Sequence, residues 1–148
     1  AWAVEVMDCP VLANGNVYSP ENADEILSQT GAAGWMIGRG AIRNPWLFHQ
    51  LRQHHAGERV FLPTGHDVLA YIRKLYDTVT DADALENARV QRIKKHINYV
   101  GVGIDAEGQF LHRIRRVNTE ADFFDICEEF LEHDRPLPLT PFVVDTSK

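Results

Sequence analysis

Cysteine is scarce in this chain of 148 residues, and long apolar runs are absent. The two cysteines, Cys9 and Cys127, lie in no CxxC or CxxH pattern, which argues against a disulfide framework and against a zinc module. We expect both to be buried thiols that act as small hydrophobic groups. The longest apolar run, around "GWMIG", is far shorter than the roughly twenty residues that a membrane span needs, so we expect no membrane partner.

An excess of positive charge is also lacking, because the formal net charge is −6. The chain as a whole is therefore a poor electrostatic match for nucleic acid or an anionic membrane, and any such partner must meet a local patch. No signal-peptide pattern precedes the first motif, and we expect a reducing, cytoplasmic location. The sequence begins with Ala1 instead of Met, as a piece of a longer protein would.

The first 56 residues predict two consecutive strand–turn–helix units. Residues 11–13 and the run "GWMIG" are apolar at every position, as short strands of a parallel sheet are when both faces are buried. Ser19 and Pro20 predict the start of an amphipathic helix after the first strand, and Gly31 predicts its end.

The second unit repeats this arrangement. Gly38-Arg39-Gly40 predicts the turn that leaves the second strand, and Asn44-Pro45 predicts the cap and first turn of another helix. Two strands alone leave both sheet edges open, and open edges pair readily with other chains. A homodimer through the exposed strands, detachment of this part, and assembly with a separate barrel fragment remain open as alternatives.

From about residue 64 the chain predicts helices only. Thr64 and Asp67 form a helix-start signature, and apolar residues recur at helical spacing through residues 86–100, 110–117 and 119–131. We therefore predict two folded parts, the strand–helix units over residues 1–56 and a helical domain over residues 64–133. A linker over residues 57–63 joins them, and an extended proline-rich tail covers residues 134–148.

The two turns after the predicted strands are a candidate phosphate site. Turns at the carboxyl ends of parallel strands lie on one face, and the amides of the helices that follow favour anions. Gly15, Gly38 and Gly40 allow a ligand to approach the backbone, and Arg39 can bind phosphate oxygens in a bidentate manner. The alternative is that these are ordinary turns with an exposed arginine.

Charge is segregated within the helical half. Residues 86–117 hold seven basic and three acidic side chains, a net +4, whereas residues 118–148 carry a net −6. Arg89, Arg92 and His96 share one helix face, which Lys95 flanks. Such a surface would bind RNA phosphates in a salt-dependent manner, or it would form ordinary ion pairs with the acidic final helix.

The remaining polar residues point to no further chemistry. His49, His54 and His55 cluster without a carboxylate or cysteine at a ligand spacing, so we predict no metal site. No Ser-His-Asp or paired-carboxylate arrangement follows from the spacing.

Two motifs, "PVLANGNV" and "TGAAGWMIGRGAIRNPWLFHQL", resemble the last two strand–helix units of the tRNA-dihydrouridine synthases, which are flavoproteins. The segment "RVQRIKKHINYVG" is similar to a central helix of that family's helical domain. The resemblance runs from residue 10 to about residue 130. It implies a mixed α/β and all-α fold, in which a partial (β/α) TIM-barrel fragment is followed by a C-terminal helical bundle.

The resemblance also implies a cofactor and a substrate. In this family the two turns hold the phosphate of FMN, and reduced FMN delivers hydride to uridine in tRNA, with NADPH as reductant of the complete enzyme. The implied FMN-binding residues are Asn14, Gly15, Asn16, Gly38 and Arg39. The family usually has an acidic residue where Asn16 stands, so a side-chain role there is not implied. The candidate RNA-binding residues come from the charge pattern of the helical half, which the resemblance favours as an RNA-binding surface. They are Arg89, Arg92, Lys95, His96, Arg113 and Arg116.

No catalytic residue is carried over by the resemblance. In the family a cysteine on a mid-barrel loop donates the proton, and no segment of this chain corresponds to that loop. Cys9 precedes the first strand and so lies at the non-catalytic end of the barrel. We therefore expect an oxidoreductase fragment that is inactive alone. The alternatives are a freestanding helical RNA-binding or interaction module with a vestigial barrel arm, and a phosphate-binding protein completed by dimerisation.

Overall fold

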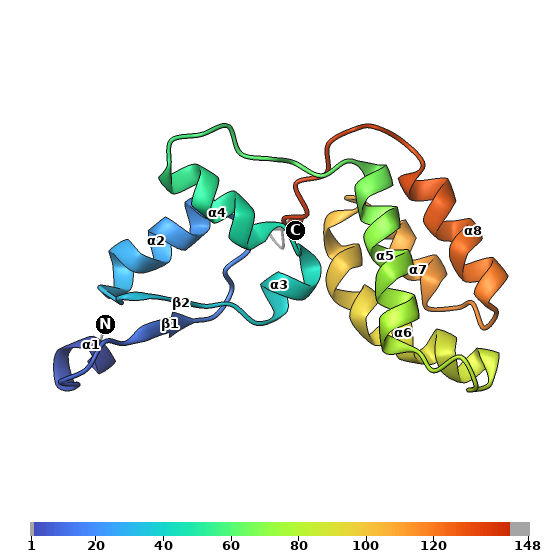
Figure 1. Cartoon of the computed structure of the whole chain (residues 1–148), viewed down its shortest axis with the longest axis horizontal. Helices are drawn as coiled ribbons and strands as arrows, with labels where there is room; N and C mark the ends of the chain where they lie inside the picture. The colour runs from blue at the N-terminus through green and yellow to red at the C-terminus, as the bar shows by residue number, and fades with distance from the viewer. Residues whose placement is uncertain (1, 143–148) are drawn as a thin grey trace, which may run out of the picture. The chain divides into compact units, whose positions relative to one another are not determined.

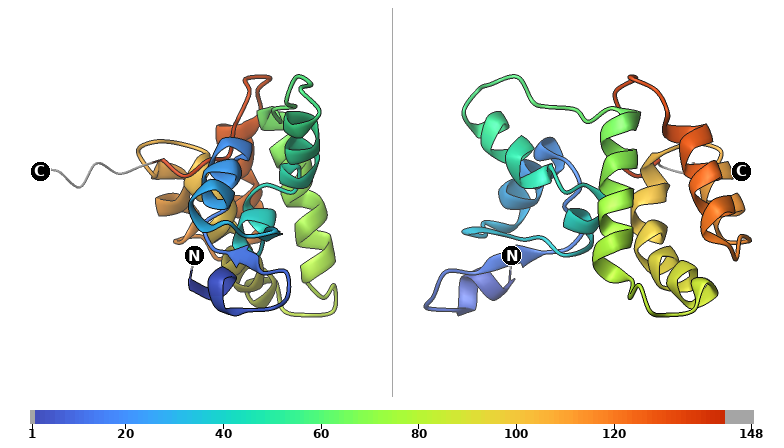
Figure 2. Two further views of the ribbon diagram at one scale, coloured as in Figure 1. Left: turned by 90° about the vertical axis from the view of Figure 1, so that its left-hand side faces the viewer. Right: turned by 45° about the vertical axis from the view of Figure 1, so that its right-hand side comes forward.

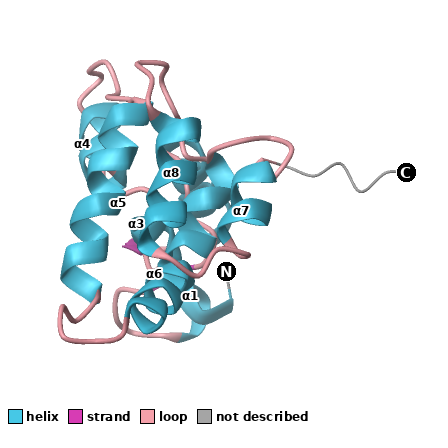
Figure 3. Cartoon of the chain, turned by 90° about the vertical axis from the view of Figure 1, so that its right-hand side faces the viewer, coloured by secondary structure: helices cyan, strands magenta, loops and turns pink. Residues whose placement is uncertain are grey.

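The computed structural model describes residues 2–142, which are mostly helical (Figure 3). The chain separates into two compact units, which we call the N-terminal unit, Ala1–Phe61, and the C-terminal unit, Leu62–Lys148. The helical character and the small parallel sheet described next agree with part of the predicted fold class.

The N-terminal unit contains a two-stranded parallel sheet. Strand β1, Leu12–Asn14, pairs with β2, Gly34–Met36, so that Ala13 lies opposite Trp35. Helix α2, Pro20–Thr30, connects the strands and contacts both of them, and α4, Leu47–His55, packs on α2 (Figure 1). The predicted order of strand, helix, strand and helix is confirmed.

Local signals explain the ends of α2. The Ser19 hydroxyl accepts a hydrogen bond from the backbone amide of Asn22 at 3.1 Å, and Pro20 occupies the first helical position. Gly31 closes the helix in the left-handed conformation, with a φ of 68°. Both boundaries agree with the sequence prediction.

The expectation that both strand faces are buried is wrong. Leu12 is 57% exposed and Met36 is 50% exposed. Helices cover the other side of the sheet, where the Trp35 indole donates a hydrogen bond to the Ala23 carbonyl at 2.7 Å. Leu12 and Met36 alternate with Ala13 and Trp35 along the paired strands, so they lie on the opposite side of the sheet from these helices.

Two short helices were not predicted. Helix α1 covers Trp2–Val6, and α3 covers Arg39–Arg43, where the sequence predicted a turn. Asn44 was predicted to be the cap of α4, but it ends α3, and Trp46 holds the position directly before α4. The Asn44 side chain still binds at the entry to α4: its oxygen accepts a hydrogen bond from the Trp46 amide at 3.1 Å, and its amide donates one to the Gln50 side chain at 2.7 Å.

The two cysteines differ. Cys9 is exposed, so the expectation that it is buried is wrong, whereas Cys127 is buried as predicted. Burial raises the pKa of the Cys127 thiol to about 12.

The C-terminal unit consists of packed helices (Figure 2), and Ile72, Ile97 and Phe123 on three of them are fully buried. Its elements are α5 (Gly65–Val79), α6 (Glu86–Val100), the 3₁₀ helix η1 (Gly101–Gly103), α7 (Gln109–Ile114) and α8 (Glu120–Leu131). Helix α8 packs on α5, α6 and α7. The predicted ranges of α6 and α8 are confirmed, and α7 is shorter than predicted.

A capping box begins α5. The Thr64 amide donates to the Asp67 carboxylate at 2.8 Å, and the Asp67 amide donates to the Thr64 hydroxyl at 3.3 Å.

Residues 136–142, after the last helix, pack against the rest of the unit. The Leu137 amide donates to the Pro63 carbonyl at 2.7 Å, and Leu139 is fully buried. The remainder of the predicted tail, residues 143–148, lies outside the described residues.

Candidate functional site

The loops that follow β1 and β2 lie against each other within the N-terminal unit. Parallel pairing brings the carboxyl ends of both strands to one edge of the sheet. A Cβ atom at Gly40 would stand 2.1 Å from the Val17 carbonyl oxygen, a distance that no side chain tolerates. Glycine at this position therefore allows the start of α3 to touch the loop after β1.

The structure brings the five predicted phosphate-binding residues to this edge. Asn14, Gly15, Asn16, Gly38 and Arg39 are all exposed there. Gly15 has a φ of 135°, which requires glycine, and Asn16 is left-handed with a φ of 47°. A Cβ atom at Gly15 or Gly38 would meet no atom of the described residues within 4 Å, so the backbone is open to a ligand at both glycines.

Two guanidinium groups flank these loops. Arg39 and Arg43 are spaced i, i+4 on α3, which places them on the same side of that helix. Burial, followed by the nearby positive charge of Arg39, lowers the pKa of Arg43. The loops thus combine open backbone with concentrated positive charge, which suits a phosphate group. The sequence prediction overlooked Arg43 because it placed a turn where the structure has a helix.

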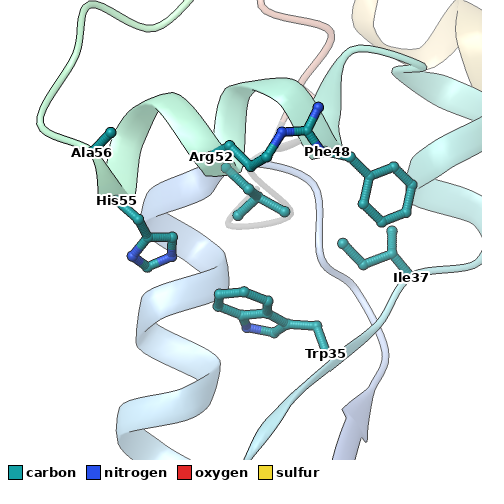
Figure 4. Close-up of a pocket in the computed structure, with 7 residues that line it drawn as sticks. Trp35, Ile37, Phe48, Arg52, His55 and Ala56 are labelled. Atoms are coloured by element: carbon teal, nitrogen blue, oxygen red, sulfur yellow. The ribbon is translucent and has the colours of Figure 1, made fainter.

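An apolar pocket of about 580 Å³ lies elsewhere in the N-terminal unit, between β2 and α4 (Figure 4). Trp35 and Ile37 form one wall, and Phe48 with Arg52 stands on the other. It contains none of the predicted phosphate-binding residues. At its rim, His55 also lies 3.4 Å from a carboxylate oxygen of Asp24.

A histidine pair joins α2 to α4. The Nε2 atom of His54 lies 2.9 Å from one Asp24 oxygen, while His55 lies near the other. No cluster of three or more histidine, cysteine, aspartate or glutamate side chains suited to a metal ion occurs within residues 2–142.

In the C-terminal unit, two of the six predicted RNA-binding residues form ion pairs with α8. Arg89 lies 3.0 Å from the Glu120 carboxylate, and Arg113 donates to Glu129 at 2.7 Å. Tyr76 donates to the same Glu120 carboxylate at 2.9 Å. These are the contacts expected if the basic residues serve as partners of the acidic final helix.

The other four predicted RNA-binding residues form no such ion pair with any residue that the structure describes. Arg92, Lys95 and Arg116 are exposed and His96 is half-buried. Within the part of the chain that the structure describes, none of them forms an ion pair with a carboxylate. Arg115, which was not among the six, is also exposed, and its Nε donates to Asn98 at 3.0 Å. A basic surface thus remains available to an anionic partner.

Sequence comparison decides which family this arrangement belongs to. The model of the dihydrouridine synthase (Dus) family matches residues 3–134, which include most of both units. This chain belongs to the dihydrouridine synthase family. The resemblance inferred from the two motifs is thereby confirmed, and the freestanding RNA-binding module is not favoured.

Relatives of this dihydrouridine synthase chain come from several bacteria. A probable tRNA-dihydrouridine synthase of Mycobacterium tuberculosis is 32% identical over 133 residues, which cover 90% of this chain and 34% of that protein. A probable tRNA-dihydrouridine synthase of Rickettsia conorii is 30% identical over 127 residues, 85% of this chain and 38% of that protein. The tRNA-dihydrouridine synthase B of Shewanella oneidensis is 30% identical over 135 residues, 83% of this chain and 38% of that protein.

The dihydrouridine synthase chain thus spans little more than a third of the length of these relatives. Among its described residues, no helix has the length and apolar character that crossing a membrane requires.

Proposed function

We propose that this chain is the C-terminal part of an FMN-dependent tRNA-dihydrouridine synthase, where it contacts the cofactor phosphate and the tRNA. The contact between Gly40 and the Val17 carbonyl carries the proposal, because it joins the two loops whose motifs resemble the family's phosphate site. The relatives bear the name of this activity. A cytoplasmic location goes with tRNA as the substrate.

The loop residues fit a phosphate monoester. Open backbone at Gly15 and Gly38 permits close approach, and the Arg39 guanidinium supplies a charged, directional donor. Asn14 and Asn16 border the same loop and would contribute backbone or amide contacts. When bound and reduced, FMN would supply the hydride for reduction of uridine. In the complete enzyme, NADPH would return the oxidised FMN to its reduced form.

We assign no catalytic residue to this chain. Cys9 precedes β1, at the opposite end of the strand from the loops, and so is not placed to donate a proton there. We therefore expect the chain alone to bind without forming dihydrouridine, and we assign the full reaction to the complete protein.

Titration with FMN and riboflavin tests the cofactor proposal, because the two differ by the phosphate. We expect the chain to bind FMN and not riboflavin, and Arg39→Gln to weaken FMN binding by about tenfold or more, as loss of a charge-assisted hydrogen bond does. Arg59→Gln, which removes another arginine of this unit, is the matched control. Equal binding of both flavins, or binding of neither, would contradict the proposal.

The basic surface of the C-terminal unit is proposed to bind the tRNA backbone. Arg92, Lys95, His96 and Arg116 lie within a +4 segment and have no ion-pair partner among residues 2–142. An unmodified tRNA transcript should bind with an affinity that falls steeply as salt rises. Arg92→Gln with Lys95→Gln should reduce the slope of log affinity against log salt by about two, while Lys74→Gln on α5 should leave it unchanged.

A further inference from the structure

Lys94 is a buried cation within the C-terminal unit. Its side chain is 7% exposed, unlike those of its neighbours on α6 that face solvent. Its ammonium group donates hydrogen bonds to the carbonyl of Arg115, at 3.2 Å, and to the carbonyl of Val117. Burial lowers the pKa of Lys94. A buried ammonium group costs free energy unless it is hydrogen-bonded, so these two carbonyls account for its position.

The two carbonyls belong to the segment that ends α7. Carbonyl groups at a helix C-terminus lack intrahelical partners and carry partial negative charge, so a cation stabilises them. Lys94 therefore stabilises the backbone of residues 115–117 through hydrogen bonds to carbonyl groups, and it forms no ion pair with a carboxylate of the described residues. Arg115 and Arg116 both lie in this segment, so their positions depend on the hydrogen bonds from Lys94.

Two more hydrogen bonds fix the same segment along one edge of α6. Arg115 Nε donates to Asn98 at 3.0 Å, and the Gln91 amide donates to Asn118 at 3.1 Å. Gln91, Lys94 and Asn98 are three and four residues apart, which places them in one row on the helix. Lys94 lies in the middle of that row, and the segment after α7 runs beside it.

Exposed cations lie near this row: Lys95 is directly beside it, and Arg92 is farther round the solvent-facing side of α6. Lys95 is four residues after Gln91 and three before Asn98, and Arg92 is one turn before Lys95. Arg115 and Arg116 directly follow α7 and are exposed. Within residues 2–142 none of these four cations pairs with a carboxylate, whereas Arg113 on α7 pairs with α8. A gathering of uncompensated cations suits an extended polyanion.

We propose that Lys94 is a positioning residue for RNA binding. By holding the carbonyls of Arg115 and Val117, it keeps Arg115 and Arg116 on the Lys95 side of α6. These two cations and the pair Arg92 and Lys95 on α6 then contact one stretch of phosphate backbone. This inference rests on the proposed function of the C-terminal unit as a tRNA-binding surface.

Lys94→Met tests this role, because methionine has a similar length and no donor. We expect its affinity for an unmodified tRNA transcript to fall by about tenfold or more at 0.1 M salt, and the salt slope to fall by about two. Lys94 itself is buried and does not reach phosphate, so a change of slope reports the loss of other contacts. Circular dichroism and thermal melting check that the helices remain folded.

A double-mutant cycle separates positioning from general loss of structure. In an Arg115→Gln/Arg116→Gln background, Lys94→Met should have no further effect on affinity. In an Arg92→Gln/Lys95→Gln background it should keep its full effect. Equal effects in both backgrounds, or an unchanged salt slope in Lys94→Met, would overturn the inference.

If Lys94→Met does not fold, variants of surface residues can test the same inference. Gln91→Ala and Asn98→Ala together remove the two flanking hydrogen bonds without opening the core, and they should lower the salt slope by about one. No change in this double variant would overturn the inference by itself. If the unaltered chain shows no salt-dependent tRNA binding, the proposed function fails as well, whereas a binding wild type with an indifferent Lys94→Met overturns the inference alone.

Discussion

At the scale of single residues, Gly40 decides whether the two loops meet. We predict that Gly40→Ala destabilises the N-terminal unit by about 1–3 kcal/mol, as insertion of a methyl group into a packed site does. The Cβ atom would stand 2.1 Å from the Val17 carbonyl oxygen, so the backbone must move. Urea unfolding followed by tryptophan fluorescence measures the loss. Gly38→Ala, whose Cβ meets no atom within 4 Å, is the control and should cost clearly less.

Tyr76 makes the stability of the C-terminal unit sensitive to alkaline pH. Burial, aided by the hydrogen bond to Glu120, raises the pKa of Tyr76 to about 12 from 10.0. The folded state therefore favours the neutral phenol, and this stabilisation is complete below pH 10 and is lost as pH rises towards 12. We predict that unfolding free energy falls by about 1–3 kcal/mol over this window through Tyr76.

Comparison with Tyr76→Phe isolates this contribution, because other groups titrate in both proteins. The phenylalanine variant should be less stable at pH 8, where it lacks the bond to Glu120, and the difference from wild type should shrink between pH 10 and 12. Denaturant unfolding at a series of pH values measures it. A difference that stays constant across that range would contradict the assignment.

At the scale of elements, the N-terminus of α7 depends on one carboxylate. Asp105 accepts hydrogen bonds from the amides of Gln109, at 2.6 Å, and Phe110, at 3.2 Å, while Gly108 at the cap position offers no side chain. We predict that Asp105→Ala lowers unfolding free energy by about 1–2 kcal/mol, the range measured for loss of a helix cap. Glu107→Ala is the matched control. Equal effects of the two variants in urea unfolding would exclude this capping role.

The sequence predicted the elements whose signals are local. Helices α2, α5 and α8 directly follow the N-cap residues Ser19, Thr64 and Thr119, and each of these side chains caps the first turn. Helix α6 followed from its apolar stripe. The short helix α3 was not predicted, because five residues with an internal glycine show no helical repeat of apolar residues. The prediction that both strand faces are buried was wrong, because burial depends on which elements pack on the strands and not on the strands themselves.

The candidate sites divide in the same way. The glycine-containing turn after β1 was predicted, because the signals for a turn lie within a few residues. The predicted turn at Gly38-Arg39-Gly40 instead opens the short helix α3. The pairing of Arg89 with Glu120 and of Arg113 with Glu129 was not resolved by the sequence, since it depends on how α8 packs across the unit. The same holds for Lys94, whose partners on the α7 segment lie more than twenty residues away.

At the scale of the whole molecule, we predict that the uncovered side of the sheet determines the association state. Leu12 and Met36 expose apolar side chains on two adjoining strands, and two-stranded sheets are marginal without a covered face. We therefore expect the chain to pair with a second copy through these strands when the remainder of a complete enzyme is not present. Light scattering coupled to size-exclusion chromatography should give the mass of a dimer.

Charge on the strands should separate this dimer. Leu12→Lys together with Met36→Lys places like charges at the shared face, so we expect the monomer mass and an unchanged helical circular dichroism spectrum. Leu85→Lys is the matched control, because Leu85 is 82% exposed in the C-terminal unit and lies on no strand. A monomeric wild type, or a dimer that survives both strand lysines, would show that the sheet does not mediate association. FMN binding that disappears with the dimer would mean that the second copy supports the phosphate loops, whereas retained binding would show that one chain supplies the whole phosphate site.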